Sequence, residues 1–362
     1  MFKRFFSNLL PWAQCLLLIC AASAAHSAPV QPDPAAALRA KYASLAEPLR
    51  QNQFKRPLAL DSIQTPNSLK GDIYAIVDYS FGAVNAGLND PDHWCDVMLL
   101  HFNTKYCHAM AAPSGTTLRV NVGKKTSEEL AAAPRVEFQY SSVATGADYV
   151  EIVLSAKDGP LGTSDYRIVL EAVALPNAKT FLHLTYSYTM NIAGRLAMNA
   201  YLGTIGSDKV GFTVMGTLPD GKPDYIGGVR GLVERNTMRY YLAIDTYLGA
   251  ANAAPAAQLE KRLQNWFTAA ERYPRQLHEM DRQAYLEMKQ AGTSAAFGQD
   301  VAAPLDRRDQ RKQDQALGLV PFAVKLHGDL VAQLQAIAQA RTMGMNEVVA
   351  ELLTKALADQ PK

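Results

Sequence analysis

Six segments with β-strand signals follow one another closely between residues 101 and 190. Most of them are bounded by Gly, Pro or Asn. In chain order they are HFNTKYCHA, TTLRVNVGK, RVEFQYSSV, DYVEIVLSA, DYRIVLEAVAL and TFLHLTYSYTM. Connections as short as these join antiparallel neighbours, whereas parallel strands need crossovers of roughly a dozen residues or more. The sequence therefore predicts an antiparallel meander.

Strand and helix signals flank this meander on both sides. Residues 71–80, GDIYAIVDYS, alternate like a strand, and residues 81–99 predict one or two short helices interrupted by Pro91. After the meander, apolar residues recur at helical spacing through residues 227–250: Leu232, Met238, Leu242 and Leu248. A helix with this pattern is expected to lie on an apolar surface.

The order of a strand, two small helices, a meander and a closing helix resembles the START-like (SRPBCC-type) superfamily. The resemblance covers about residues 71–250. Three segments carry the resemblance and look like the corresponding parts of exported bacterial members of unassigned activity: GDIYAIVDYSFGAVNAGLNDPDHWCDVML, DGPLGTSDYRIVLEAV and VRGLVERNTMRYYLAIDTYL. It implies an α+β helix-grip fold, in which a curved antiparallel sheet wraps around a long C-terminal helix. It also implies a cavity for a lipid or other hydrophobic small molecule.

The N-terminus has the three-part layout of a secretory signal over residues 1–28. Two basic residues precede an apolar run that peaks at Leu16 to Cys20, and small residues follow up to Ala28. This apolar run is shorter than a typical transmembrane helix. The alternative is a signal that is not cleaved and anchors the chain in the membrane. We expect cleavage after Ala25 or Ala28 and a periplasmic or secreted protein.

The mature chain would carry no net charge. The signal contains two of the 36 basic residues and none of the 34 acidic ones, which leaves 34 of each sign. A balanced charge gives no global attraction to nucleic acid or to an anionic membrane. With 48% hydrophobic residues, the chain can bury one large core or two smaller ones.

Two of the four cysteines lie in the signal, so Cys95 and Cys107 would remain. An even pair in an exported chain favours a disulfide, and free thiols are a second possibility. A zinc site is the third, with two of His93, His101 and His108 as further ligands, but the spacing fits no compact metal-binding pattern. We expect an oxidised pair, with no bound metal and no cofactor.

The span from His93 to His108 also contains Asp96, His101 and Lys105. A histidine beside a carboxylate can act as a general base near neutral pH. The alternative is a polar rim whose aspartates cap helix starts while the neighbouring tryptophan and the disulfide fill core. The sequence lacks the GxSxG, P-loop, GxGxxG and HExxH motifs. We therefore favour the structural interpretation and expect binding rather than catalysis.

Two sets of residues near the end of the meander and in the closing helix are candidates for ligand contact. Tyrosines that line a sheet and its closing helix give an apolar wall with a few hydroxyls: Tyr186, Tyr188, Tyr201 and Tyr240. Arginines of the closing helix could hold a carboxylate or phosphate headgroup: Arg230, Arg235 and Arg239. Core packing of the rings and a solvated ion pair are the structural alternatives.

The remaining stretches are expected to lie outside the ligand domain. Residues 29–70 predict an N-terminal extension with one short helix, before an ordered domain that begins near Gly71. Residues 251–290 predict a helical extension packed on the domain. Residues 291–319 carry polar charge without periodicity and predict a flexible linker.

Residues 320–358 resemble the ribbon-helix-helix family of small intertwined dimers. Val324 and Leu326 alternate as in a short strand, and two helical patterns follow around a turn at Gly344. This family usually inserts its ribbon into DNA, which would place Ala323, Lys325 and His327 in the groove. Residues 322–362 have four basic and four acidic residues, whereas phosphate contact calls for excess positive charge. We therefore expect a homodimer through 320–358, within a segment that spans 320–362, and no affinity for nucleic acid.

The sequence as a whole favours a periplasmic binding or carrier protein for a lipid or another hydrophobic small molecule. The resemblance implies this ligand class, and the composition only permits it. One alternative is an enzyme of cyclase or hydrolase type on the same fold, which would use the cluster from His93 to His108. Another is a DNA-binding or dimerisation role of the C-terminal segment. The direction in which the histidines point would separate a carrier from an enzyme.

Overall fold

The structure is a computed structural model that describes residues 33–126, 128, 130–204 and 206–299, together with some helical residues between 333 and 352. The chain divides into two units, Met1–Asp300 and Val301–Lys362. The expected signal at residues 1–28 lies outside the described residues. None of the helices in the described part of the chain is both long and apolar enough to cross a membrane.

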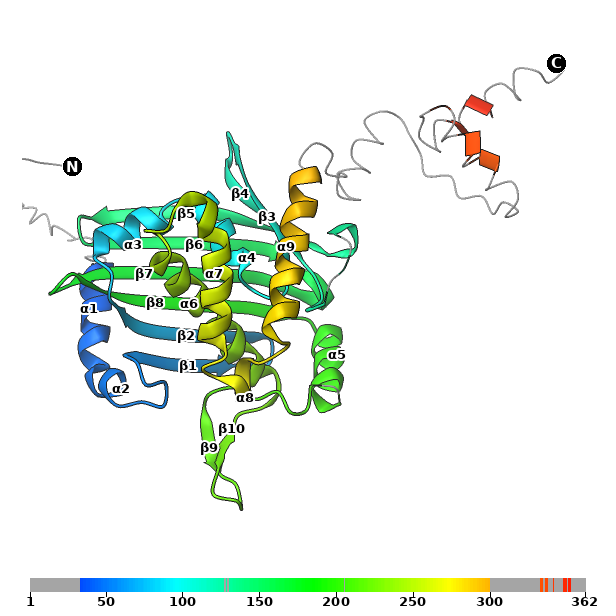
Figure 1. Cartoon of the computed structure of the whole chain (residues 1–362). Coiled ribbons are helices and arrows are strands. Elements are labelled where there is room, and N and C mark those ends of the chain that lie inside the picture. The colour runs from blue at the N-terminus through cyan, green and yellow to red at the C-terminus, as the bar shows by residue number, and fades with distance from the viewer. Residues whose placement is uncertain are drawn as a thin grey trace, which may run out of the picture. The chain divides into compact units, whose positions relative to one another are not determined.

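The first unit is built on one antiparallel sheet of eight strands (Figure 1). The strands are β1 (Leu58–Gln64), β2 (Ser68–Val77), β3 (Thr104–Ala112), β4 (Gly115–Val122), β5 (Arg135–Gly146), β6 (Tyr149–Asp158), β7 (Thr163–Leu175) and β8 (Lys179–Met190). Their order in the sheet is β1-β2-β8-β7-β6-β5-β4-β3. All neighbours except β2 and β8 are consecutive in the chain, as the short connections predicted.

Two helices connect β2 to β3, as predicted: α3 (Phe81–Leu88) and α4 (Pro91–Leu99). Ser80 and Asp90 cap them by accepting hydrogen bonds from backbone N–H groups of the first turn. Pro91 occupies the first turn of α4, where its missing N–H costs nothing. The aspartates of this stretch therefore include a helix cap, as the structural interpretation expected.

A long helix, α6 (Gly228–Gly249), lies on one face of the sheet (Figure 1). Its apolar residues Met238 and Leu242 are fully buried. The helix passes very close to β2, because a Cβ atom at Gly71 would lie 2.3 Å from Thr237 Oγ1. A glycine is therefore required here unless Thr237 shifts. The meander and this helix confirm the predicted α+β helix-grip fold.

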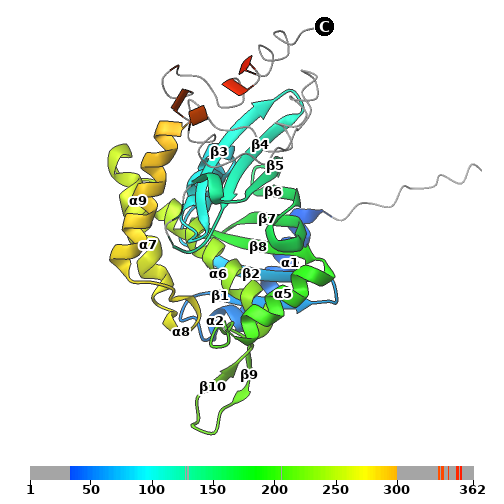
Figure 2. The ribbon, with the colours of Figure 1, turned by 90° about the vertical axis from the view of Figure 1, so that its right-hand side faces the viewer.

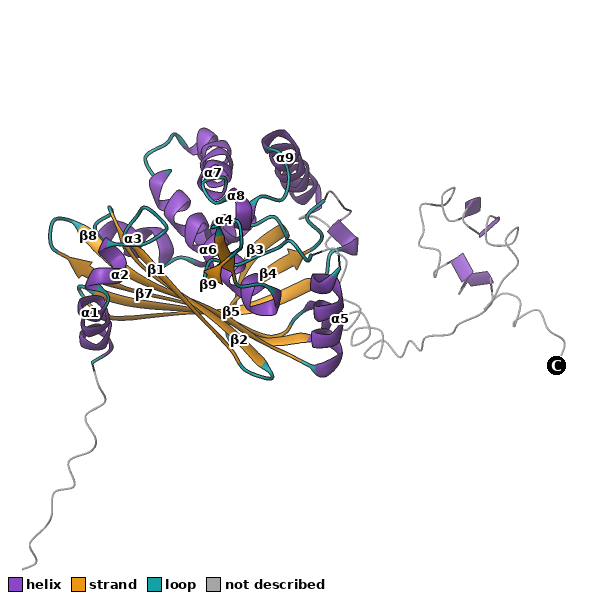
Figure 3. Cartoon of the chain, turned by 90° about the horizontal axis from the view of Figure 1, so that it is seen from below, coloured by secondary structure: helices purple, strands orange, loops and turns teal. Residues whose placement is uncertain are grey.

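The C-terminal helices of the unit form a third layer over α6 (Figure 3). They are α7 (Pro255–Ala270), α8 (Pro274–Leu277) and α9 (Arg282–Gln299). The fully buried Trp266 of α7 donates from Nε1 to the Arg239 carbonyl at 3.1 Å. Helix α9 continues to Gln299, into the range that the sequence assigned to a linker.

The domain begins earlier in the chain than Gly71. Helices α1 (Pro34–Ser44) and α2 (Ala46–Arg50) precede β1, which pairs with β2 along its whole length. Helix α1 covers the face of the sheet opposite α6, where Tyr42 packs on Phe181 with 5.1 Å between ring centroids. Residues 34–64, which the sequence assigned to an extension, therefore belong to the same unit as the sheet.

A segment between β8 and α6 was not predicted. It contains α5 (Ile192–Gly203) and a two-stranded hairpin of β9 (Val214–Thr217) and β10 (Pro223–Tyr225), which projects from the domain (Figures 1 and 2). The fully buried Glu234 of α6 anchors it by accepting hydrogen bonds from the backbone N–H groups of Phe212 and Thr213 at 2.6 and 2.9 Å.

In the second unit the described residues 333–334, 336–337, 341, 348–349 and 351–352 are helical. Leu334 and Val348 are buried, and Arg341 pairs with Glu351 at 3.0 Å. The predicted strand around Val324 and the predicted turn lie outside the described residues. The ribbon-helix-helix assignment and the homodimer therefore remain predictions.

Candidate functional site

The two mature cysteines form a disulfide that ties α4 to β3. Cys95 and Cys107 are bonded, with their Cα atoms 5.1 Å apart, which confirms the predicted pairing. Sulfur atoms bonded to each other are not available as zinc thiolates. Among the described residues, no group of three or more His, Cys, Asp or Glu side chains is placed to hold a metal ion.

The polar residues around the disulfide do not converge on one point. His93 lies 3.0 Å by Nδ1 from the Gly87 carbonyl and packs on Tyr247. Asp96 accepts a charged hydrogen bond from Arg262 at 2.7 Å, and His108 is exposed on β3. These three side chains therefore make no shared catalytic constellation.

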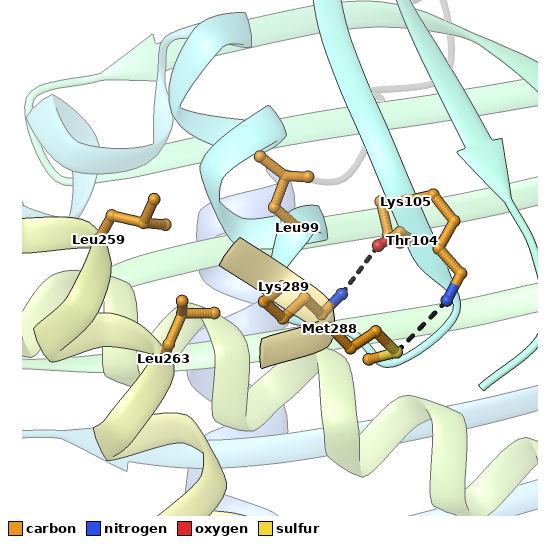
Figure 4. Close-up of a pocket in the computed structure, with 7 residues that line it drawn as sticks. All are labelled: Leu99, Thr104, Lys105, Leu259, Leu263, Met288 and Lys289. Carbon is orange, nitrogen blue, oxygen red and sulfur yellow. Dashed lines mark hydrogen bonds between the residues drawn. The ribbon is translucent and has the colours of Figure 1, made fainter. Parts of the chain in front are cut away.

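Lys105 is engaged in packing between β3 and α9. Its Nζ donates to the Thr126 carbonyl at 2.8 Å and lies 3.4 Å from Met288 Sδ. The pocket beside it (Figure 4) is lined by Leu99, Thr104, Lys105, Leu259, Leu263, Met288 and Lys289 and has a volume of about 10 Å³. That volume holds about one water molecule, so this pocket is not a place for a lipid.

His101 points into the space between the sheet and α6. The side chain is 5% exposed and stacks on Tyr240 of α6, with ring centroids 5.2 Å apart. Its Nδ1 accepts from the Asn103 N–H at 3.2 Å, so Nε2 carries the hydrogen of the neutral ring. No described residue forms a hydrogen bond of normal geometry with this buried Nε2, although the contact with the Asn236 side chain acts to raise the pKa of the ring.

Four tyrosines form a continuous array next to His101. We call this set the tyrosine array: Tyr166 of β7, Tyr186 and Tyr188 of β8, and Tyr240 of α6. Ring centroids are 5.2 Å apart for Tyr166 and Tyr188, 5.6 Å for Tyr186 and Tyr188, and 5.3 Å for Tyr186 and Tyr240. Burial raises the pKa of all four hydroxyls, so they stay protonated. The array lines the grip from the sheet to the helix.

Part of the hydrogen-bonding capacity of the array is not used within the protein. Tyr166 donates to Thr163 Oγ1 at 2.9 Å, and a hydrogen bond with Asn236 acts on the pKa of Tyr186. The structure shows no hydrogen bond between a described residue and the hydroxyl of Tyr188 or Tyr240, and neither oxygen is among the fully buried polar atoms that lack a partner. These two hydroxyls can therefore bond to water or to a guest molecule.

The three predicted arginines lie in different environments. Arg239 is fully buried and pairs with Glu279 at 2.6 Å. Its side chain therefore packs toward the C-terminal helices. Arg235 is also buried, and its charge acts on the pKa of Tyr188. Arg230 is half-buried and donates from Nε to Ser62 Oγ at 2.8 Å. Tyr201 lies in α5, and its side chain is outside the described residues.

Arg230 borders an open groove of about 580 Å³ at the start of α6. The groove is lined by the β1–β2 turn, by Arg195 of α5, and by the start of α6: Gln64, Thr65, Pro66, Arg195, Ile226, Gly227 and Arg230. The Met190 N–H donates to Asn67 O at 3.0 Å, which places the end of β8 beside the same turn. Tyr188 and this groove therefore lie toward the same end of the sheet.

Sequence reasoning missed Tyr166 and Arg195 as members of the site. Tyr166 alternates with the buried Ile168 and Leu170 of the same strand, so the period of two could have placed it inside the grip. Arg195 lies in α5, an element that the sequence did not predict. Its role depends on how the chain folds back after β8.

Acid should destabilise the fold partly through His101. Burial, and then the charges of Arg239 and Lys289, lower the pKa of His101 well below 6.5. The unfolded chain binds a proton below pH 6.5 while the folded ring stays neutral, so this residue lowers the free energy of unfolding by up to about 1.4 kcal/mol per pH unit. A His101→Phe variant should lose this contribution, as measured by urea unfolding between pH 7 and 5.

The matched control for this prediction is His108→Phe, since His108 is exposed. It should keep the acid sensitivity of the wild type. Identical pH profiles for wild type and the His101→Phe variant would show that His101 titrates normally in the folded protein.

No family model matches the chain, and no curated protein matches it. Solved structures give distant likenesses. The chain is similar to norcoclaurine synthase from Thalictrum flavum, with 12% identity over 41% of this chain and 82% of that chain, at a TM-score of 0.26. It is similar to human StAR-related lipid transfer protein 5, with 10% identity over 59% of this chain and 94% of that chain, at a TM-score of 0.31. A conserved protein from Geobacillus kaustophilus gives 10% identity over 51% and 95%, at a TM-score of 0.29.

Proposed function

We propose that this protein is a binding or carrier protein that holds a hydrophobic small molecule or lipid in the grip between the sheet and α6. The observation that carries the proposal is the tyrosine array. Four aromatic rings from two strands and one helix form its wall, and the hydroxyls of Tyr188 and Tyr240 have no partner among the described residues. An apolar wall with a few placed polar groups is the usual composition of a small-molecule site.

The ligand that suits this wall has an apolar body and a polar end. The rings offer dispersion contacts along the body. Arg235, buried near Tyr188, and Arg230, at the groove, favour an acidic end such as a carboxylate or phosphate. We propose that the body lies along the array and that the polar end points toward the groove at the start of α6.

The hydroxyls of the array give a direct test. Tyr188→Phe and Tyr240→Phe should each weaken binding of a fluorescent fatty acid about 2- to 12-fold, because each removes one hydrogen bond worth about 0.5–1.5 kcal/mol. Tyr149→Phe is the control, since its hydroxyl donates to Glu171 on the opposite face of the sheet at 3.0 Å. Fluorescence titration measures all three. Equal affinities for the wild type and both inner variants would contradict the proposed place of binding.

An enzyme on the same fold is a second candidate, and His101 is the observation that favours it. His101 is one of the candidate catalytic residues between 93 and 108, and its side chain is buried beside Tyr240 of α6. The Nε2–H of the neutral imidazole can donate to the oxygen of a bound carbonyl or hydroxyl compound. Turnover of a bound ligand that His101→Asn abolishes, without loss of ligand affinity, would establish an enzyme. A ligand recovered unchanged supports the carrier.

We propose a periplasmic or secreted location, supported by the signal pattern of residues 1–28 and by the disulfide. Protein purified from its native source should begin at residue 26 or 29 and should yield an organic extract with a copurified lipid-like compound in mass spectrometry. A chain that retains residues 1–28 would contradict cleavage. A ligand-free extract would count against the carrier.

We propose also that residues 320–358 pair with a second copy of the chain. The segment is too small to bury a core alone, and its charges balance, which disfavours nucleic acid. Deletion of residues 320–362 should convert a dimer to a monomer in sedimentation velocity while the ligand domain stays folded. A dimer that survives the deletion, or salt-sensitive binding of the intact chain to duplex DNA, would contradict this.

A further inference from the structure

Helix α5 has apolar side chains both on the face that packs on the domain and on an exposed face. Its inner face packs Met198 and Leu202 on the core. Its outer face exposes Ile192 and Leu196, which are one turn apart and are 68% and 64% exposed. Helices at the surface of a monomer normally carry polar residues on the outer face. The outer face of α5 is therefore suited to an apolar partner.

A turn next to α5 extends this apolar face. Leu161, in the short helix η2 (Pro160–Gly162), is 80% exposed. The turn lies against the start of α5, because a Cβ atom at Gly194 would be 2.6 Å from the Leu161 carbonyl oxygen. The backbone N–H of Asn191 also donates to Gly162 O at 3.0 Å. The turn that carries the exposed Leu161 is therefore adjacent to the start of α5, where Ile192 lies.

The β9–β10 hairpin exposes a second apolar group nearby: Val214, Met215 and Leu218, with Met215 61% exposed. The hairpin and α5 lie toward the same end of the domain in two perpendicular views (Figures 1 and 2). They also border the same groove, since Arg195 belongs to α5 and Ile226 follows β10 directly. A hairpin of two short strands gains little stability alone. Its exposed apolar residues therefore indicate a binding surface rather than a folding element.

The groove between these two apolar groups is cationic. Arg195 and Arg230 are the charged members among the seven described residues that line it, and none of the seven is acidic. Arg195 donates to the Pro66 carbonyl and Arg230 to Ser62 Oγ, and Ser62 Oγ in turn donates to the buried Glu234 at 2.5 Å. No carboxylate of the lining neutralises them. The charge of this groove is thus complementary to a phosphate group.

We infer that α5, the turn at Leu161 and the β9–β10 hairpin dock the domain on a lipid bilayer that contains anionic phospholipids. The aliphatic and Met side chains enter the boundary between headgroups and acyl chains, and a headgroup phosphate lies in the groove between Arg195 and Arg230. The inference rests on the proposed carrier function, because a carrier of a membrane lipid must reach the bilayer to load or deliver it.

A bilayer fits this surface better than a protein partner. The six exposed apolar residues are aliphatic or Met, whereas the anchors of protein interfaces are enriched in Trp, Tyr and Arg. These apolar residues lie on separate projections with a cationic groove between them. Apolar side chains could therefore enter the bilayer on both sides of a headgroup that is bound in the groove. The mature chain has no net charge, so attraction to anionic lipid must come from such a local site.

Vesicle flotation with the full mature chain tests the inference. The protein should float with vesicles of 70% phosphatidylcholine and 30% phosphatidylglycerol, and at least tenfold less with pure phosphatidylcholine. The double variant Ile192→Asp/Leu196→Asp, the single variant Met215→Asp and the single variant Arg195→Glu should each reduce flotation with the anionic vesicles at least tenfold. All four positions are on the surface, and circular dichroism checks the fold of each variant.

Matched controls come from the exposed face of α7. Gln264→Asp/Thr268→Asp adds the same two charges at the same spacing, and Lys261→Glu makes the same charge reversal as Arg195→Glu. All three positions are exposed, and the control variants should float like the wild type. Equal loss in the controls would show a general effect of negative charge and would overturn the inference.

Two further outcomes would also overturn it. Undiminished flotation of the Ile192→Asp/Leu196→Asp and Met215→Asp variants would assign membrane binding to another surface. Absence of flotation, with self-association that the same variants abolish, would make this surface a contact between copies of the chain. Binding of the fluorescent fatty acid in the absence of vesicles is measured in parallel, and the docking variants should retain it. A chain that floats but does not bind the fatty acid would refute the carrier function and leave the docking surface standing.

Discussion

Replacing Glu279 with Ala should lower the free energy of unfolding by about 3–5 kcal/mol, because the change leaves a buried arginine without its partner. Arg239 is fully buried, and Glu279 is nearly so. Glu279 also pairs with Lys125 and Lys209 at 2.6 and 3.0 Å. Urea unfolding at pH 7 measures the loss. Glu271→Ala is the control, since Glu271 pairs with the exposed His278 and should cost under about 1 kcal/mol.

The same carboxylate should contribute to the pH dependence of stability. Burial alone would raise the pKa of Glu279, but the charges of Arg239 and Lys125 outweigh it and lower the pKa to about 2. A lowered pKa means that the stabilisation is present above the unfolded value of 4.5 and is lost as pH falls toward 2. A loss below about 1 kcal/mol at pH 7 would show that Arg239 does not depend on Glu279, and would restore it as a candidate ligand contact.

Removal of the disulfide is the second change with a large expected effect. A Cys95→Ala/Cys107→Ala variant should lose about 3 kcal/mol of unfolding free energy, since the bridge closes a loop of twelve residues in the unfolded chain. His101 lies within that loop, so the affinity for the fluorescent fatty acid should fall as well. The control is a reductant, which should destabilise the wild type and leave the variant unchanged. An unfolding free energy of the wild type that does not change with the reductant would contradict the prediction.

The parts of the fold that the sequence predicted are those with one buried face. The strands β3–β8 alternate inward and outward residues, and α6 repeats apolar residues at helical spacing, so their patterns are visible without a structure. Strand β1 is different because it lies at the sheet edge and exposes much of its length. The strands of the hairpin β9–β10 have no buried residue, so no periodicity marked them.

The sequence predicted those members of the candidate site that lie in the last strand and in the closing helix. Tyr186, Tyr188 and Tyr240 could be placed because the last strand and the closing helix of a grip face each other. The partner of Arg239 could not be found, because Glu279 is forty residues away and follows a short helix without a periodic signal. The inward direction of His101 likewise depends on the connection between α4 and β3, whose course the sequence pattern does not specify.

Photo-crosslinking of the full mature chain with a diazirine-bearing fatty acid tests most directly whether a ligand binds inside the grip. The reaction is carried out in solution without vesicles, and the labelled residues are identified by tandem mass spectrometry. We predict label on residues of the tyrosine array and on their neighbours in β8 and α6, and competition by excess unlabelled fatty acid. Label confined to exposed residues such as Ile192, Leu196 and Met215 would contradict binding between the sheet and α6.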